Sequence, residues 1–600
     1  MAGCLVLLLF LALLSFSGNA DVSIDCGAFD SYADENSIVW IGDDDLFKNS
    51  QSEVVQPSNP ASHVMSTLRV FTTLKKNCYS ITADKGSLVL VRASFFYGNY
   101  DKRSSPPSFG LLFDGNHWAT VKTSLDQLVY YEVMYVVKSD TTSICLAQTQ
   151  PNQFPFISAL EVRNLDSKMY GDVDPNYALF LRSRVAFGAN TTVRFPDDGY
   201  DRIWVPARVG SELVSVASGA ILIDVANAPD NPPPEVLQNA ITTSNTSGSI
   251  TLTPGFPDQD VSVYMNLYFS EVTELDTTQK RSFIAYIDNM KSSEPIIPPY
   301  GAAKEMSANF TASANTSISL VSTTDSTLPP LINAMEVFYV SDRLTDGTNS
   351  KDVEGLGELQ NTFRVLQEYW SGDPCLPSPY TWERISCSND AIPRRKLICV
   401  PDVFGSFRDL SSLDLSGPLP DFSSMDALVT IDLHNNSITG PIQDFLGAFP
   451  NLKDLNLADN SFSGPIPQSI SSNKKLKFVA SGNPDLCVSG KSCQPTSTDG
   501  TIITSTPSGG RKKSNKLPVI LGTTIPIFVF FWAIVGFLVH HKRRTAAIAA
   551  ITADKTGGAN RPSVANTMMG QVGEAVINEI RVNIQDQTTS ENGDQSVPQQ

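Results

Sequence analysis

The sequence predicts a mostly β protein, with two tandem β-sandwich domains, a short leucine-rich solenoid, a single transmembrane helix and a disordered tail. Three patterns predict this order. Residues 155–162 recur as residues 330–337, which indicates a duplicated unit. Leucines then repeat with a spacing of 24 residues across 428–464, as in a solenoid. An apolar run at 517–539 is long enough to cross a membrane.

The N-terminus has the features of a secretory signal peptide. An apolar run at 5–14 leads to a stretch of small residues at 17–20, which is the pattern that signal peptidase needs. We therefore predict a signal peptide over residues 1–20 and a mature chain that begins near Asp21.

Each predicted sandwich domain contains short runs rich in Val, Ile, Phe and Tyr, separated by Gly, Pro, Asn and Asp. Such runs are typical of the strands of an all-β sandwich. A second match, between residues 109–114 and 283–288, has nearly the same offset as the first. We place the first copy at 21–173 and the second copy at 174–345. The strand-like runs are 88–91, 130–137, 261–269 and 283–287.

A linker without the strand-like runs of the two copies is predicted at 346–400. Apolar residues with helical spacing predict a helix over 352–366. A cysteine-bearing segment at 372–387 follows this helix and separates it from the repeats.

The leucine-rich repeats are predicted at 401–493. Leu433 and Asn436 of one repeat correspond to Leu457 and Asn460 of the next. In such repeats, leucines fill the core of each coil and the asparagine satisfies backbone groups at the turn. We therefore expect these residues to be structural, and we expect the flanking cysteine segments to cap the coils.

Beyond the repeats the chain changes in composition. Residues 494–516, rich in Ser, Thr and Pro, predict a solvated stalk. As a helix, 517–539 would extend ~34 Å, and the hydrocarbon core of a bilayer is ~30 Å thick. Residues 540–600 are predicted as a mostly disordered cytoplasmic tail without kinase signatures, with an amphipathic helix around Val576 and Ile580 as the alternative.

Five glycosylation sequons precede the apolar run and none follows it. This one-sided distribution is expected when only the part before the membrane meets the glycosylation machinery. Together with the signal peptide, it predicts a single-pass type I protein of the plasma membrane with an extracellular N-terminus. The acceptor residues are Asn190, Asn245, Asn309, Asn315 and Asn435.

Eight cysteines lie between the signal peptide and the apolar run. An even number in an oxidising compartment predicts disulfides. Cys375 with Cys387, and Cys487 with Cys493, are close enough in sequence to pair locally. The other four allow three pairings, among which the sequence does not choose. These four are Cys26, Cys78, Cys145 and Cys399.

The charge and chemistry of the chain exclude several classes of function. A net charge of −18 and a pI near 4.8 argue against nucleic-acid binding. The sequence has no nucleophile elbow, and only His63, His117 and His434 lie before the apolar run. We therefore expect no enzyme activity, no cofactor and no metal ion.

Six short motifs are spread over nearly the whole predicted exterior. They are Ile24-Asp25-Cys26-Gly27, Asn77-Cys78-Tyr79, Tyr97-Gly98-Asn99-Tyr100-Asp101, the segment 196–204, Gly372-Asp373-Pro374-Cys375 and Gly464-Pro465-Ile466-Pro467. Together they resemble plant receptor-like proteins in which a malectin-like ectodomain precedes a short leucine-rich repeat. Most relatives of this layout end in a cytosolic kinase, whereas this chain resembles the receptor-like proteins that lack one.

The resemblance implies tandem malectin-like β-sandwiches that recognise carbohydrate. The animal namesake binds glucose-containing oligosaccharides through aromatic residues and a carboxylate. An aromatic face suits the apolar side of a sugar ring, and carboxylates suit its hydroxyls. Burial in the core is the competing interpretation of such strand aromatics. The predicted carbohydrate-binding residues are Phe95, Phe96, Tyr97, Tyr100 and Asp101 in the first copy and Tyr268, Phe269 and Glu271 in the second.

We therefore predict a membrane-embedded receptor-like protein that binds a cell-wall or other glucose-containing carbohydrate and has no kinase activity of its own. An associated receptor kinase would carry the signal. The alternatives are a co-receptor that binds a secreted peptide and a tether between wall and membrane. For the co-receptor, the predicted interface includes exposed strand positions of the solenoid, which are Val429, Thr430, Asp432, Lys453, Asp454 and Asn456.

Overall fold

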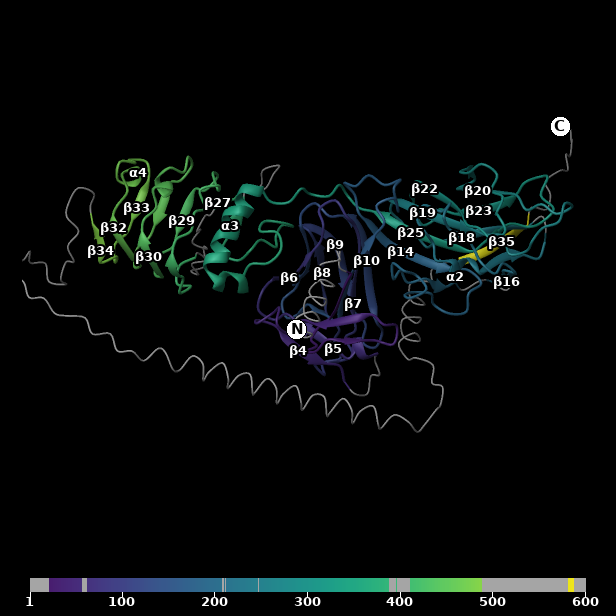
Figure 1. Ribbon diagram of the computed structural model, residues 1–600, viewed down its shortest axis with the longest axis horizontal. Coiled ribbons are helices and arrows are strands. Elements are labelled where there is room, and N and C mark those ends of the chain that lie inside the picture. Colours follow the sequence, from purple (N-terminus) through teal and green to yellow (C-terminus); the bar gives the residue numbers. More distant parts are fainter. Residues whose placement is uncertain are drawn as a thin grey trace, which may run out of the picture. The chain divides into compact units, whose positions relative to one another are not determined.

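The structure of the protein is a computed structural model. Its described part contains two β-sandwich copies, a connector and a solenoid, in that order along the chain (Figure 1). Strands predominate, so the predicted mostly β fold class is confirmed. The described residues are 21–56, 62–207, 210, 212–245, 248–387, 395–396, 410–487 and 581–586.

The first copy is a sandwich of two layers. Its elements are β1 (Val22–Asp25), β2 (Tyr32–Ala33), β3 (Val39–Gly42), β4 (Gln51–Val54), η1 (His63–Met65), β5 (Thr67–Val70), β6 (Lys76–Thr82), β7 (Leu88–Phe95), β8 (Ser108–Phe113), β9 (Asn116–Lys122), β10 (Val129–Val136), β11 (Thr141–Ala147), β12 (Phe156–Ile157) and β13 (Ala159–Leu165). One layer belongs to a large sheet in the order β2-β3-β1-β13-β7-β10, and the other contains β6-β11-β8-β9 and β12-β5-β4. The layers pack face to face, since the ring centroids of Phe113 on β8 and Tyr135 on β10 are 4.5 Å apart.

The central strand β7 is buried on both faces. Val89 and Val91 join the core between the two layers, whereas Leu90 packs in a separate apolar cluster on the opposite face. Because successive side chains of a strand point to opposite faces, Arg92 is also directed away from the sandwich core. It is buried nonetheless, so its charge needs partners inside the protein.

The second copy repeats the sandwich. Its elements are β14 (Leu179–Ala186), β15 (Val205–Pro206), β16 (Leu213–Ala217), α2 (Pro234–Leu237), β17 (Asn239–Thr243), β18 (Gly248–Thr253), β19 (Val261–Phe269), β20 (Phe283–Ile287), β21 (Met290–Lys291), β22 (Lys304–Ala312), β23 (Ile318–Ser322), β24 (Leu331–Ile332) and β25 (Ala334–Val340). The large sheet continues as β14-β25-β19-β22, with β15 beside β14, and the other layer contains β21-β20-β23-β18 and β16-β17-β24. Phe269 and Phe283 link the layers, with ring centroids 5.3 Å apart.

The recurring sequence occupies equivalent places in the two copies. Residues 155–162 contain β12 and the start of β13, and residues 330–337 contain β24 and the start of β25. In each copy the longer strand lies in the large sheet, beside β7 or β19, and the shorter one pairs in a small sheet, with β5 or β17. The topology therefore repeats together with the sequence.

The connector follows β25. Its helix α3 (Ser350–Thr362) begins after Asn349, whose side chain accepts a hydrogen bond from the backbone N–H of Lys351. The turn η2 (Arg364–Glu368) continues from it, so the predicted helix over 352–366 exists as two shorter pieces. The short strands β26 (Ser386–Cys387) and β27 (Arg395–Lys396) follow. The disulfide between Cys375 and Cys387 confirms a predicted pair.

The solenoid has parallel strands on two sides. Its elements are β28 (Ser416–Pro418), β29 (Thr430–Asp432), β30 (Ser437–Pro441), η3 (Asp444–Gly447), β31 (Asp454–Asn456), β32 (Ser461–Pro465), α4 (Gln468–Ser471), β33 (Lys477–Val479) and β34 (Asp485–Cys487). Asn436 Nδ2 donates to the carbonyls of Leu410 and Leu433, at 2.8 and 3.0 Å. Asn460 Nδ2 donates to Leu433 O at 2.8 Å. The predicted structural role of these asparagines is confirmed.

A second disulfide joins Cys78 on β6 to Cys145 on β11, which are paired neighbours in their sheet. Cys26 is a buried free thiol. The expectation that all the exterior cysteines form disulfides is therefore wrong for Cys26. Cys399, the fourth member of this predicted set, lies outside the described residues.

Several predictions fall outside the described residues. These are the signal peptide at 1–20, the stalk at 494–516 and the apolar run at 517–539. Cys487 is disulfide-bonded, and its predicted partner Cys493 also lies outside. Across the described ranges, no helix is both long enough and apolar enough to span a bilayer.

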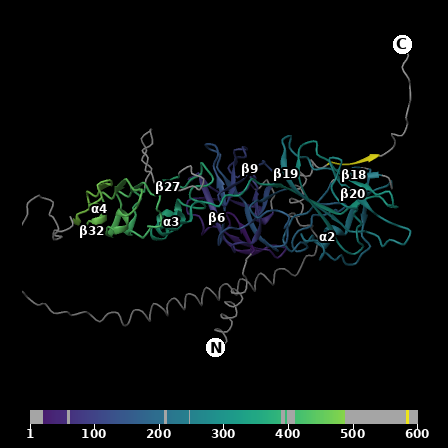
Figure 2. The same ribbon diagram turned by 90° about the horizontal axis from the view of Figure 1, so that it is seen from above.

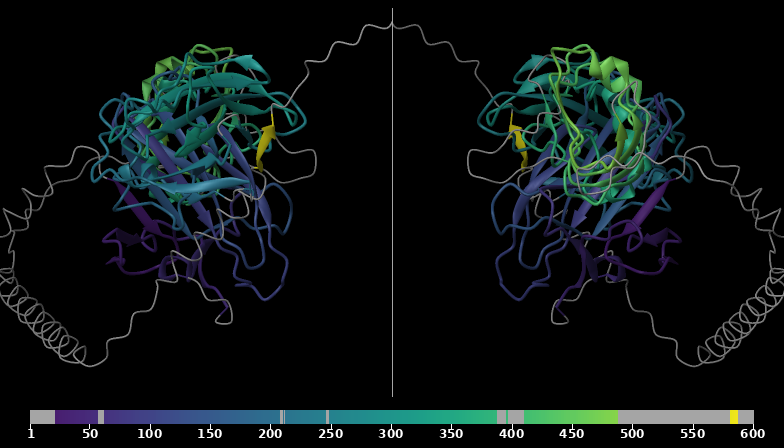
Figure 3. Two further views of the ribbon diagram at one scale, coloured as in Figure 1. Left: turned by 90° about the vertical axis from the view of Figure 1, so that its right-hand side faces the viewer. Right: turned by 90° about the vertical axis from the view of Figure 1, so that its left-hand side faces the viewer.

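One strand lies in the predicted tail. β35 (Arg581–Asp586) pairs antiparallel with β18, from Thr253 opposite Arg581 to Gly248 opposite Asp586. Figure 1 shows β35, in yellow, near β18, and the yellow strand is seen from further directions in Figure 2 and Figure 3. The predictions of disorder or a helix are therefore wrong for these six residues.

Candidate functional site

A pocket of about 310 Å³ lies at the junction of the two copies, between β10 and β14. These strands pair at only two positions, Val133 with Phe180 and Met134 with Leu179, and then part. β14 also shifts its register against β25 between Leu181 and Ser183. Such a bulge bends a strand, so it helps β14 diverge from β10. We call this cavity the junction pocket, and its lining residues are Trp118, Ala119, Tyr130, Tyr131, Glu132, Phe180, Leu181, Arg182, Ser183, Arg184, Val205 and Tyr339.

Aromatic side chains form much of the junction pocket. Tyr130, Tyr131, Phe180 and Tyr339 are partly exposed, so part of their surface is available to a ligand. The Tyr131 hydroxyl donates to Thr120 O at 3.4 Å, which links β10 to β9. A cavity with several partly exposed rings suits a ligand that has both apolar faces and polar edges.

Buried charges cross the large sheet beside the pocket. Arg92 on β7 lies between Glu161 on β13 and Glu132 on β10, at 3.1 and 3.0 Å. Glu132 then accepts a hydrogen bond from Arg184 Nη1 on β14 at 2.6 Å, which crosses from one copy to the other. Arg184 Nε donates in turn to Glu336 on β25 at 2.6 Å. The charges alternate along the row, so each buried ion has a partner of opposite sign.

The electrostatic surroundings keep Arg184 charged. Burial disfavours the charged guanidinium, but the adjacent carboxylates of Glu132 and Glu336 outweigh burial and raise the pKa of Arg184 above its ordinary value. A permanent cation therefore stands in the wall of the junction pocket.

Two polar atoms of the pocket wall have no hydrogen-bond partner among the residues that the structure describes. Arg184 Nη2 and Ser183 Oγ are buried, and neither makes a hydrogen bond within the described part of the chain. Their residues are only 2% and 3% exposed. A buried donor without a partner is unfavourable by about 1–3 kcal/mol. An oxygen-rich ligand that entered the junction pocket would supply acceptors for such atoms once a small side-chain movement uncovered them.

A family model described as a malectin-like domain matches residues 24–340, which is more than half of the chain. The protein belongs to the malectin-like family. A leucine-rich repeat model also matches residues 451–473. The resemblance found in the sequence is confirmed, and the junction pocket lies within the malectin-like region.

Two proteins of Arabidopsis thaliana are similar to much of this chain. The uncharacterized Arabidopsis thaliana protein At1g24485 is 37% identical over 356 residues, which are 58% of this chain and 70% of that protein. The probable LRR receptor-like serine/threonine-protein kinase At1g05700 of Arabidopsis thaliana is 32% identical over 396 residues, 64% of this chain and 46% of the kinase. The chain therefore spans less than half of that kinase. The family and these relatives indicate an extracellular receptor-like role.

Among solved structures, the ANX2 ectodomain from Arabidopsis thaliana is similar to this chain. The TM-score is 0.47 and the sequence identity is 19%. The similar region covers 54% of this chain and 97% of the ANX2 chain.

The carbohydrate-binding residues predicted in the first malectin-like copy are mostly core residues. Phe95, Phe96 and Tyr97 are at most 1% exposed, and the ring of Phe95 packs edge-to-face against Tyr131 with centroids 6.2 Å apart. Their faces are already covered by protein, so we reassign these three to the core. Tyr100 and Asp101 are partly exposed, and their contact with a sugar stays a prediction.

The residues predicted in the second malectin-like copy are also buried. Tyr268 and Phe269 have no exposed surface. The Tyr268 hydroxyl donates to Glu336 Oε2 at 2.6 Å, and Glu271 Oε2 accepts from Arg281 Nε at 2.7 Å. Their polar groups are thus used inside the protein, so we reassign these three residues to structural roles as well.

The five sequon asparagines are all exposed, four of them in the malectin-like region and one in the solenoid. Each is therefore accessible to a glycosylating enzyme, although glycosylation itself stays a prediction. The acceptor asparagines in chain order are Asn190, Asn245, Asn309, Asn315 and Asn435.

No group of three or more His, Cys, Asp or Glu residues that could hold a metal ion is found within the described ranges.

Proposed function

We propose that the protein is a receptor-like protein whose malectin-like copies bind a carbohydrate in the junction pocket. The observation that carries this proposal is the combination of partly exposed aromatic walls with the unpartnered Arg184 Nη2 and Ser183 Oγ. Sugar rings have an apolar C–H face for the aromatic rings and hydroxyl oxygens for the donors. The ligand class is a cell-wall or other glucose-containing oligosaccharide.

The size of the junction pocket supports recognition of a small part of a glycan. Its volume of about 310 Å³ is at the lower end of ligand pockets, which run from about 300 to 1,000 Å³. A pocket of this size suits one or two sugar rings at the end or side of a longer chain. Residues outside the pocket would then contact the rest of the glycan.

The proposal includes type I membrane topology and no catalytic activity. Relatives named as receptor-like kinases support a membrane protein, and the exposed sequon asparagines support an extracellular malectin-like region. A receptor kinase in the same membrane would provide the signalling that this chain does not. The pairing of β35 with β18 conflicts with this topology, because the two strands would lie on opposite sides of the membrane.

An epitope tag after Gln600 tests the topology. Type I topology predicts that an antibody reaches the tag only after the cells are permeabilised. Access in intact cells would instead place the tail beside the malectin-like region, as the pairing of β35 with β18 requires.

Binding of the purified full-length protein to an array of wall-derived and glucose-based oligosaccharides tests the carbohydrate. The variants are Tyr131→Ala and Tyr339→Ala, and Tyr300→Ala is a matched control because Tyr300 is an exposed tyrosine outside the pocket. Each pocket variant should weaken binding by about 1 kcal/mol, roughly fivefold in Kd. Absence of binding to the whole array by a folded protein would favour the peptide-binding co-receptor instead.

A further inference from the structure

The connector returns from the second copy to the first. Lys138 on the first copy donates to Thr345 O at 3.1 Å and forms an ion pair of 2.8 Å with Asp346. The backbone N–H of Thr345 donates to Asn116 Oδ1 at 2.9 Å. The chain therefore leaves the second copy at β25 and is held again by the first copy within a few residues.

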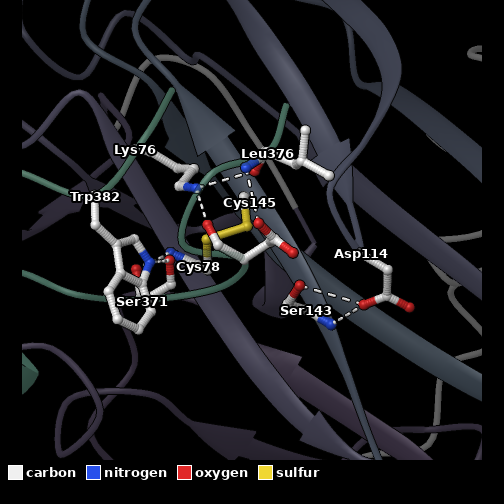
Figure 4. Close-up of a disulfide and its surroundings, with 9 residues drawn as sticks. Lys76, Cys78, Asp114, Ser143, Cys145, Ser371, Leu376 and Trp382 are labelled. Atoms are coloured by element: carbon white, nitrogen blue, oxygen red, sulfur yellow. Dashed lines mark hydrogen bonds between the residues drawn. A yellow bond between two sulfur atoms is a disulfide. The ribbon is translucent and has the colours of Figure 1, made fainter. Parts of the chain in front are cut away.

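The second attachment lies at the Cys78–Cys145 disulfide (Figure 4). The Lys76 ammonium donates to Asp373 O at 2.6 Å and to Leu376 O at 3.2 Å. The backbone N–H of Cys78 donates to Ser371 Oγ at 3.1 Å. These bonds tie segment 371–376, which we call the clip, to β6 of the first copy.

A groove of about 680 Å³ lies between the first copy and the connector. Strands β6, β8, β10 and β11 supply one wall, and the clip and α3 supply the other. Its volume is about twice that of the junction pocket and well within the range of ligand sites. The groove is therefore a second cavity, and its lining residues differ from those of the junction pocket.

The most exposed apolar residues of this groove are aliphatic. Leu46 is 60% exposed and Val353 on α3 is 42% exposed, and both line the groove. Of the aromatic side chains that line it, Phe47 is partly exposed, whereas Phe113, Tyr135 and Trp370 are almost fully buried. The most exposed apolar residues are thus Leu46 and Val353, and they suit an aliphatic side chain of a ligand.

The groove carries more negative than positive charge. Asp114, Asp346 and Asp373 line it, and the lysine among the lining residues, Lys138, is paired with Asp346. Within the described residues, Asp114 forms no ion pair, and its oxygens accept from Ser143 N–H at 2.7 Å and Thr142 Oγ1 at 3.0 Å. Burial raises the pKa of Asp114 to about 6. A cationic ligand would stabilise the ionised form of this carboxyl group.

The second copy contains a counterpart of Asp114 that lies outside the groove. Asp288 accepts from Ser317 N–H at 2.9 Å and from Thr316 Oγ1 at 3.1 Å, which reproduces the two hydrogen bonds of Asp114. Both aspartates have a positive φ, 43° and 47°. Both aspartates belong to the same kind of turn, which explains why an aspartate occurs at both positions. In the first copy the connector lies near this turn and forms the groove.

We infer that this groove binds an extended peptide that carries a lysine or arginine side chain. The basic group lies at Asp114, and an aliphatic side chain of the peptide lies between Leu46 and Val353. Sugar hydroxyls can also donate to this carboxylate, but only a cationic group forms an ion pair with it, and this together with the exposed aliphatic residues favours a peptide. This site is independent of the junction pocket, so either proposal can fail without the other.

The test uses purified full-length protein and three series of synthetic octapeptides built from Ala, Val, Leu and Gly. The series differ only in one central residue, which is Arg, Gln or Glu. The Arg series should bind at least tenfold more tightly than the other two. Similar binding of the Arg and Gln series, or no binding of any series, would overturn the inference.

Three variants locate the site. Asp114→Asn keeps the shape of the turn, and Val353→Lys places a positive charge at an exposed position, so each should lower the affinity for the Arg series at least tenfold. Asp288→Asn is the matched control, because it changes the same turn outside the groove, and it should bind as the wild type does. Equal losses in Asp114→Asn and Asp288→Asn would show a general effect on folding and overturn the assignment.

Discussion

Arg184 and Glu132 form a 2.6 Å ion pair across the junction of the two malectin-like copies. It lies where β10 and β14 no longer share backbone hydrogen bonds, since their ladder contains only two residue pairs. The same arginine also contacts Glu336, and the same glutamate contacts Arg92. The two copies are therefore joined by side-chain charges at a place where the backbone ladder of the sheet is interrupted.

Replacing Glu132 by glutamine should destabilise the protein strongly. The substitution keeps the shape of the side chain but removes the charge that faces both Arg92 and Arg184, and all three are buried. Loss of one partner from a buried ion pair typically decreases the free energy of unfolding by about 3–5 kcal/mol. Urea unfolding measures the change. Asp325→Asn, which removes the exposed pair with Lys280, is the control and should have no measurable effect.

The stability of the second copy should depend on Glu305 and on pH. Asp230 N–H donates to Glu305 Oε2 at 3.0 Å, and burial, together with the Asp230 carboxylate, raises the pKa of Glu305 from 4.5 to about 8. The folded protein then holds more protons than the unfolded chain between these two values, so the free energy of unfolding decreases as pH rises through this window.

Glu305→Gln mimics the protonated side chain and should reduce this pH dependence. Above pH 8 the variant should melt at a higher temperature than the wild type, and near pH 4.5 the two should be similar. Thermal melting at several pH values is the measurement. Parallel pH profiles of the two proteins would contradict the prediction.

Gly372 should be needed for attachment of the clip. Its φ is +64°, and an added Cβ would lie 2.5 Å from Cys78 Sγ and 2.8 Å from Cys145 Sγ. A strained backbone conformation alone costs about 1–3 kcal/mol. Gly372→Ala should therefore accelerate hydrogen exchange of the Cys78 amide at least tenfold, because that amide donates to Ser371. Gly199→Ala, where nothing lies within 4 Å, should leave the exchange unchanged.

Cys26 should be unreactive in the native protein. The thiol has no exposed surface, and burial and the nearby Asp43 raise its pKa well above the ordinary value, which keeps it protonated. Iodoacetamide should label Cys26 only after the protein is unfolded, as detected by mass spectrometry of the peptides. Labelling under native conditions would mean that the N-terminal strands open readily.

Much of the fold could be predicted from the sequence because its signals are local or periodic. The recurrence at residues 155–162 and 330–337 corresponds to equivalent strands, and the spacing of Asn436 and Asn460 corresponds to their backbone hydrogen bonds. The pair Cys375 and Cys387 was close enough in sequence to predict. The free thiol of Cys26 could not be predicted, because pairing depends on which strands lie side by side.

The site was harder to predict, because burial of an aromatic side chain depends on the opposite layer of the sandwich. Phe95 and Tyr131 lie on neighbouring strands of one sheet, yet Phe95 is fully buried and Tyr131 is partly exposed in the junction pocket. A usable signal was nevertheless present. Glu132 and Arg184 are charged residues within strand segments that are otherwise mostly apolar or aromatic. Such residues indicate positions where a buried charge needs a partner of opposite sign.

The return of the connector to the first copy sets the order in which the molecule yields to a mechanical load. Tension applied from the solenoid reaches the clip first, where Lys76 holds Asp373 and Leu376. It next reaches Lys138 at Asp346. Only after both attachments break can the pull peel β25 away from β14 and β19, so the second copy is shielded from force by the first.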